Sequence, residues 1–337
     1  MPLLRLLVSI TACWLLAIST GTVGAQSARQ AEEVKERMAL IRAVSQDWYQ
    51  KDYAGLERQA QRYSDLTERT QSGFAKLAYF YEFFFALARE QSPYFPKGDH
   101  FSKLEFWQDA LPDSTTAKMV KSIFLLEQAK HYNEVTNKNR VPVTPWTFDA
   151  GMLALAKLEL QAIPLERRDP HWYVVWLRIM ATSNDPLDEI VIAHDEALQR
   201  YPTYEPAHLE AFIHLAKRWS SGSGRLEAFA NTVVNRTKSQ LGMSMYTRLY
   251  EDAFVGMNND SLILNGLNWP AMKAGYQQIT AENPVPWNTN HYAFFACMAR
   301  DAPALREAFK LMAGQIVREA WHQPVFYEAC KARNQAN

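Results

Sequence analysis

The stretch PLDEIVIAHDEALQRYP, residues 186–202, decides the fold class. Its apolar side chains recur every three or four residues, which is the spacing of one face of an α-helix. A proline stands at each end, where it is compatible with the start of a helix and stops its continuation. Helices are also predicted directly before and after it, at 172–180 and 207–219, with short connections. Consecutive helices joined in this way pack as antiparallel pairs.

The same periodicity extends over most of the chain, and the alternation typical of β-strands is almost absent. Near the N-terminus, for example, Val34, Met38, Ile41 and Trp48 fall on one helical face, with charged residues between them. The pattern predicts about fifteen helices, most of about 10 to 20 residues. Helix pairs repeated along a chain stack as an α-solenoid.

Two segments approach the repeat of ~34 residues that is the tetratricopeptide period. Ala197 and Pro202 stand where a small residue and a proline end the second helix of such a unit, and Met272, Tyr276 and Pro284 have similar offsets. The predicted fold is therefore an all-α, tetratricopeptide-like α-solenoid of about fifteen antiparallel helices.

The first 25 residues have the organisation of a secretory signal peptide. Arg5 supplies the positive charge, residues 6–18 are mostly apolar, and Val23 and Ala25 precede the cleavage position. The apolar part is shorter than the ~20 residues of a membrane-spanning helix, and no later apolar run approaches that length. We predict cleavage after Ala25 and export to a bacterial periplasm or secretion. Lipidation at Cys13, within a sequence that resembles a lipobox, is the alternative.

Residues 26–337 are predicted to form a single helical domain. The polar segment 133–146 contains two prolines and is the place where an internal boundary would fall.

Export affects the interpretation of the two cysteines that the mature chain keeps, Cys297 and Cys330. In an oxidising compartment they could form a disulfide. The alternative is that both are buried free thiols, packed as small apolar side chains. Two cysteines cannot form an all-cysteine zinc site, and neither belongs to a C-x-x-C motif.

Composition and motifs exclude several classes of function. The 36 basic and 36 acidic side chains leave no net charge, so a nucleic-acid partner is not expected. Hydrophobic residues make up 48% of the chain, which is too many for a disordered protein. The glycine-rich nucleotide motifs, the serine hydrolase motif and the zinc protease motif are all absent. We therefore predict no cofactor and no catalytic or metal-binding residues.

The histidines do not form a ligand set by spacing. His208 and His214 are six residues apart, which places them on different sides of a helix. His194, followed by two acidic residues, is interpreted as part of a polar helix face. Adjacent acids such as Asp188 and Glu189 point apart, so they do not form an acid–base pair.

Tryptophan is over-represented, with 10 residues. Most of them are expected to pack between neighbouring helices. The alternative is that some line a binding groove, because tryptophan and arginine are favoured anchors at interfaces. The candidate partner-binding residues are Arg218 and Trp219, which begin a loop rich in serine and glycine, together with Arg248 and Tyr250.

Several short strings of sequence resemble a known family when taken as a set. They are Ser72-Gly73-Phe74, Tyr204-Glu205-Pro206-x-His208, Gly242-x3-Tyr246-x-Arg248-Leu249-Tyr250 and Asn290-x2-Ala293-x2-Ala296-Cys297. Over most of residues 50–300 the chain resembles the uncharacterised bacterial family known as domain of unknown function 4034. The resemblance implies a tetratricopeptide-like helical fold, and it implies no activity and no site residue.

Two functions are compatible with these observations. The first is an exported interaction or scaffold protein whose helical surface binds a protein or peptide. The alternative is an exported carbohydrate-active enzyme, a helical toroid that would need two carboxyl groups ~5 to 10 Å apart across a cleft. The absence of a catalytic motif favours the first.

Overall fold

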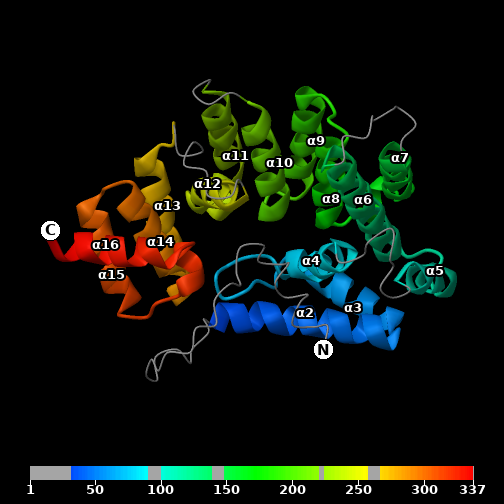
Figure 1. The fold of residues 1–337 in the computed structure, drawn as a ribbon, viewed down its shortest axis with the longest axis horizontal. Helices are drawn as coiled ribbons and strands as arrows, with labels where there is room; N and C mark the ends of the chain where they lie inside the picture. The colour runs from blue at the N-terminus through cyan, green and yellow to red at the C-terminus, as the bar shows by residue number, and fades with distance from the viewer. Residues whose placement is uncertain (1–31, 90–99, 139–147, 220–223, 257–265, 337) are drawn as a thin grey trace. The chain divides into compact units, whose positions relative to one another are not determined.

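The computed structural model describes residues 32–89, 100–138, 148–219, 224–256 and 266–336. In these residues the chain forms fifteen α-helices and two short 3-10 helices, and no β-strand (Figure 1). The predicted all-α class of consecutive helices with short connections is confirmed. The predicted signal peptide, its cleavage position and Cys13 lie outside the described residues.

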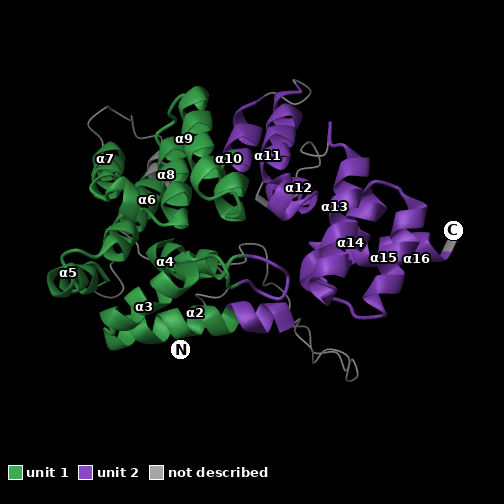
Figure 2. Ribbon diagram, turned by 180° about the vertical axis from the view of Figure 1, so that it is seen from behind, with its two compact units in different colours: residues 1–12, 38–68, 75–211 green, residues 13–37, 69–74, 212–337 purple. Residues whose placement is uncertain are grey.

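The helices belong to two compact units (Figure 2). Leaving aside the undescribed residues, unit 1 contains residues 38–68 and 75–211, and unit 2 contains 32–37, 69–74 and 212–337. The segment 133–146, the predicted place for a boundary, lies within the range of unit 1. Residues 133–138 end a long helix there, and 139–147 are not described.

The elements of unit 1 are most of α2 (Glu32–Gln50), α3 (Tyr53–Ser64), α4 (Lys76–Arg89), α5 (His100–Ala110), α6 (Thr115–Lys138), α7 (Phe148–Gln161), η1 (Leu165–Arg167), α8 (Pro170–Thr182), α9 (Leu187–Arg200) and the first half of α10 (Glu205–Arg218). Unit 2 contains the first residues of α2, the rest of α10, α11 (Arg225–Leu241), α12 (Ser244–Gly256), α13 (Trp269–Glu282), α14 (Pro286–Met298), α15 (Ala302–Met312), η3 (Arg318–Trp321) and α16 (Pro324–Ala336).

Several helices begin at a capping side chain. Asp169 precedes α8 and accepts a hydrogen bond from the backbone N–H of Trp172, while Pro170 occupies the first turn. Asp301 caps α15 in the same way. Such caps satisfy N–H groups that have no partner within the helix. At the start of α6, the hydroxyl of Ser114 accepts a hydrogen bond from the backbone N–H of Ala117.

Buried aromatic rings hold the first helices of unit 1 together. Trp48 of α2 is fully buried, with its ring 5.5 Å from Phe84 of α4, 6.3 Å from Trp107 of α5 and 6.3 Å from Phe124 of α6. Ring pairs at these separations add to the stabilisation that comes from burial alone. The predicted packing role of tryptophan is thus confirmed for Trp48 and Trp107.

Unit 2 includes a short segment, residues 69–74, that lies between α3 and α4 in the sequence. The carbonyl of Ser72 accepts hydrogen bonds from Arg248 of α12 and Asn288 of α14. The N–H and hydroxyl of Ser72 donate to the carboxylate of Glu33, at the start of α2. The guanidinium of Arg248 also lies 3.9 Å from the ring centre of Phe74. Side chains distant in sequence therefore hold this segment in unit 2.

Candidate functional site

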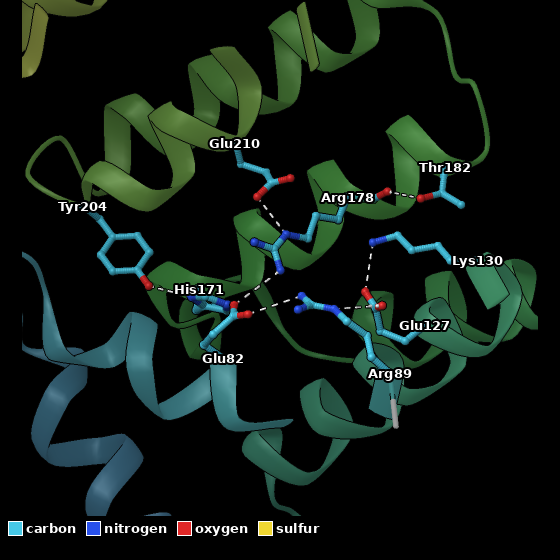
Figure 3. Close-up of polar contacts among 9 residues, drawn as sticks. All are labelled: Glu82, Arg89, Glu127, Lys130, His171, Arg178, Thr182, Tyr204 and Glu210. Atoms are coloured by element: carbon cyan, nitrogen blue, oxygen red, sulfur yellow. Dashed lines mark hydrogen bonds and ion pairs between the residues drawn. The ribbon is translucent and has the colours of Figure 1, made fainter. Parts of the chain in front are cut away.

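A network of alternating acids and bases, most of them partly buried, connects helices of unit 1 (Figure 3). Arg178 of α8 lies 2.7 Å from Glu210 of α10 and 3.9 Å from Glu82 of α4. Its guanidinium also lies 4.1 Å from the ring centre of Phe85. A planar, permanently charged guanidinium suits such a position, because it can bind two carboxylates and stack on a ring at once.

The same chain of charges continues from α4 to α6. Arg89 lies 3.3 Å from both Glu82 and Glu127, and Lys130 lies 2.9 Å from Glu127. Burial raises the pKa of Glu127, but Lys130 and Arg89 outweigh this effect and bring the pKa below its usual value. Each of these three acids lies beside a base, so the network connects helices and does not resemble the carboxyl pair of a glycosidase.

A second polar group in unit 1 involves His171 of α8. Its Nδ1 lies 2.6 Å from the hydroxyl of Tyr204, and the ring of Tyr81 stacks on it at 4.6 Å. Burial lowers the pKa of His171 well below its usual value, so the ring is neutral and Tyr204 donates to Nδ1. Tyr81 in turn donates to Asp169, and burial raises the pKa of Asp169 to about 6. These four side chains are packed between the helices of unit 1, and their hydrogen bonds and stacking hold one another in place.

The structure pairs two histidines, from α9 and α10, that the sequence pattern did not connect. His194 of α9 and His208 of α10 are both buried, and His194 Nε2 lies 3.0 Å from His208 Nδ1. His208 Nε2 lies 3.1 Å from the carbonyl of Pro202, which only accepts. In the neutral pair, His208 therefore donates to Pro202 and accepts from His194. The interpretation of His194 as part of a polar surface is wrong, because the turn between α9 and α10 brings it against His208.

In unit 2, a carboxylate–histidine pair lies between α12, α13 and α14. Glu251 Oε1 is hydrogen-bonded to His291 Nδ1, and its other oxygen accepts from the hydroxyl of Tyr276 at 3.1 Å. Burial raises the pKa of Glu251, but His291 and these hydrogen bonds outweigh it and bring the pKa to about 2. His322 stacks on His291 at 6.1 Å, and burial lowers its pKa to about 4.

The Glu251–His291 pair leads us to expect that the stability of the protein depends on pH. Because the pKa of Glu251 falls from 4.5 to about 2 on folding, its contribution is present above pH 4.5 and is lost as the pH falls towards 2. Glu251→Gln should remove up to about 3 kcal/mol of this dependence. The measurement is urea unfolding of both proteins between pH 2 and pH 7.

The matched control for Glu251 is Glu328→Gln, an exposed acid on α16 in the same unit. It should leave the pH profile unchanged. His322 loses its own contribution between pH 6.5 and about 4. Because the charge of Glu251 raises the pKa of His322, Glu251→Gln also changes the profile in this range, so the comparison for Glu251 itself is made below pH 4. Parallel profiles for the wild type and Glu251→Gln would contradict the assignment.

The outward face of α7 in unit 1 differs from these interior groups. The exposed residues of α7 whose side chains are described, and those of the turn up to Leu165 that continue the face, are uncharged: Gly151, Ala154, Leu155, Leu158, Gln161, Ala162 and Leu165. Leu155 is 46% exposed, Leu158 61% and Leu165 46%. Their spacing places them on one helix face. Contiguous apolar surface of this kind marks interaction sites.

Two charged side chains of α7 that border this face, Lys157 and Glu159, are paired. Lys157 lies 2.9 Å from Asp185, and Lys121 lies 2.5 Å from Glu159. A partner that covers these two residues would therefore not leave either of them as an unpaired charge in a dry interface, which would be costly. We call the seven exposed residues together the α7 face.

The residues predicted to bind a partner do not lie on one surface. Arg218 is exposed, and Trp219 is half-buried with its ring 6.2 Å from that of Phe229; residues 220–223 are not described. Arg248 is only 5% exposed and Tyr250 only 2%. Arg248 binds Ser72, as described above, and the hydroxyl of Tyr250 donates to Glu227 at 2.6 Å. Both side chains are used inside unit 2, so they are not available to a partner.

The structure decides between a disulfide and two free thiols at Cys297 and Cys330. Cys297 of α14 and Cys330 of α16 form a disulfide, and both are buried. Of the two alternatives, the structure therefore shows the disulfide and not the pair of free thiols.

Neither a metal-binding cluster nor a membrane-spanning helix is found in the described part of the chain. No group of three or more histidine, cysteine or acidic side chains is arranged to hold a metal ion there. Within the same residues, every helix is too short or too polar to cross a bilayer. Comparisons with protein-family models, with curated proteins and with solved structures found no match to this chain.

Proposed function

We propose that the chain is an exported helical-repeat protein that binds a protein partner through the α7 face. The observation that carries the proposal is the uncharged, exposed surface centred on Leu155 and Leu158. The partner chemistry that fits is an amphipathic helix, which would place its own apolar side chains against these leucines.

Gly151 supports a helical occupant. It lies within α7, where glycine is less favourable than alanine by about 0.5–1 kcal/mol. A Cβ atom added to Gly151 would meet no atom within 4 Å, so packing within the described chain does not require glycine there. Together with Ala154, it leaves room for the backbone of another helix to approach closely.

The proposal of export rests on the signal-like first 25 residues and on the disulfide. Disulfides persist in oxidising compartments, which fits a periplasmic or secreted protein. The resemblance to domain of unknown function 4034 fits the helical fold and adds no activity. A mature protein that begins at Gln26, found by mass spectrometry, would support export.

The partner site is tested by photo-crosslinking in cells that export the full chain. A photoreactive phenylalanine analogue replaces Leu158 in one variant and Ile192 of α9 in the control. Ile192 is slightly more exposed, at 68% against 61% for Leu158, but exposed acids such as Asp188 and Asp195 lie near it on the helix. We expect a discrete adduct from position 158, mapping to an amphipathic helix of another protein, and none from position 192. An adduct of two copies of this chain, or equal yields at both positions, would contradict the proposal.

Substitution of Gly151 should separate binding from stability. Gly151→Ala should raise the free energy of unfolding by about 0.5–1 kcal/mol, because alanine is the better helix former. The same change should reduce the yield of the position-158 adduct, because the added methyl group obstructs the approaching helix. The measurements are urea unfolding and adduct yield. A Gly151→Ala protein that is stabilised and crosslinks as well as the wild type would exclude close helix packing at this residue.

A further inference from the structure

A pocket lies in unit 1 beside the α7 face, between α7 and the end of α8. Its volume is about 310 Å³, at the lower end of the range for small-molecule sites. Asp149, Leu153 and Lys157 line it from α7, and Thr182 and Ser183 line it from the end of α8. The three α7 residues are four positions apart, so they follow one helix face over about 12 Å.

The two ends of the pocket differ in charge. At one end the ammonium of Lys157 lies between both carboxylate oxygens of Asp185, at 2.9 and 3.3 Å, so its charge is neutralised. At the other end Asp149 is only 7% exposed. Its Oδ1 is buried and has no hydrogen-bond partner among the described residues. A buried carboxylate oxygen without a donor is costly, typically by about 1–3 kcal/mol.

The position of Asp149 at the N-terminus of α7 explains only part of why a buried carboxylate is tolerated there. An acid in the first turn of a helix interacts favourably with the helix dipole. That interaction does not supply a hydrogen-bond donor to Oδ1. The remaining charge of the pocket is a single negative one, and the wall next to Asp149 is apolar, formed by Leu153 with Ala150 and Ala154.

We propose that this pocket binds an alkylammonium group. The ammonium pairs with the carboxylate of Asp149, and the alkyl chain lies along Leu153 and Ala154. The group could come from a small free amine or from a lysine side chain of a bound protein. The proposal holds whether or not the α7 face binds a partner, because small amines probe it directly.

The test is a titration of the full chain followed by NMR. The probes are n-butylammonium, uncharged n-butanol and Nα-acetyl-lysine methylamide. We expect n-butylammonium to bind at least ten times more tightly than n-butanol, with shifts at Ala150 and Ala154. Tighter binding of the lysine derivative would identify a protein lysine as the source, and binding of n-butylammonium alone would identify a free amine.

Two variants decide the assignment. Asp149→Asn keeps the shape of the side chain and should weaken n-butylammonium binding at least ten-fold. Ala154→Leu, at an exposed position, should fill the pocket and abolish binding without changing the charge. Asp188→Asn, an exposed acid on α9, is the control and should bind as the wild type does. Equal binding of n-butanol, or unchanged binding by Ala154→Leu, would overturn the proposal even if Asp149→Asn did not fold.

Discussion

Loss of the Cys297–Cys330 disulfide should lower the free energy of unfolding by about 3–4 kcal/mol. The bond joins α14 to α16 across a sequence separation of 33 residues. Without it, the unfolded chain gains the freedom of that loop, whereas the folded state keeps the packing of two buried side chains. The effect is large because the free energy of unfolding of a whole domain is only about 5–15 kcal/mol.

The measurement compares urea unfolding of the oxidised protein with that of Cys297→Ala/Cys330→Ala. Both are made in a Cys13→Ser background, which removes the third thiol. The reduced protein with both cysteines intact is the control, and it should resemble the double variant. A difference below about 1 kcal/mol would show that the bond contributes little beyond the packing of its sulfur atoms.

Removal of Arg178 from the interior network should cost on the order of 3 kcal/mol. Arg178→Met keeps most of the apolar contact with Phe85, but it leaves Glu210 and Glu82 without this base. An unpaired charge in a partly buried position is the main cost. The measurement is the free energy of unfolding of both proteins, obtained by urea titration.

A double-mutant cycle identifies the cause. Arg178→Met combined with Glu210→Gln should recover part of the loss, because the uncompensated charge is removed together with its partner. The control is Arg58→Met, which breaks the exposed pair with Asp52 and should change stability by less than about 1 kcal/mol. Equal costs for Arg178→Met and Arg58→Met would mean that the interior network behaves as a surface ion pair.

The helices near the centre of the chain were predictable because local signals agree there. The predicted helix at 186–199 corresponds to α9, Leu187–Arg200, and its starting proline is the residue before the helix. Helix α5 was not predicted. Its buried residues His100, Leu104 and Trp107 have helical spacing, but the first of them is polar, so the apolar pattern is too short to recognise.

The α7 face shows why the candidate site could not be located from the sequence. Helix α7 is apolar on more than one side: Leu153 and Leu160 are buried, whereas Leu155 and Leu158 are exposed. Periodicity shows that a helix has apolar faces but not which of them its neighbours cover. Periodicity likewise could not show that Tyr250 and His194 are buried, because other helices of the chain cover them.

The segment 69–74 has a consequence for the order in which the protein is made. Glu33 and Ser72 leave the ribosome long before Arg248, which binds Ser72 in the folded protein. The contact closes a loop of 176 residues, and loops of this length slow folding. Unit 2 can therefore be completed only after nearly all of the chain has been synthesised, and a fragment beginning at residue 212 would lack part of its own interior.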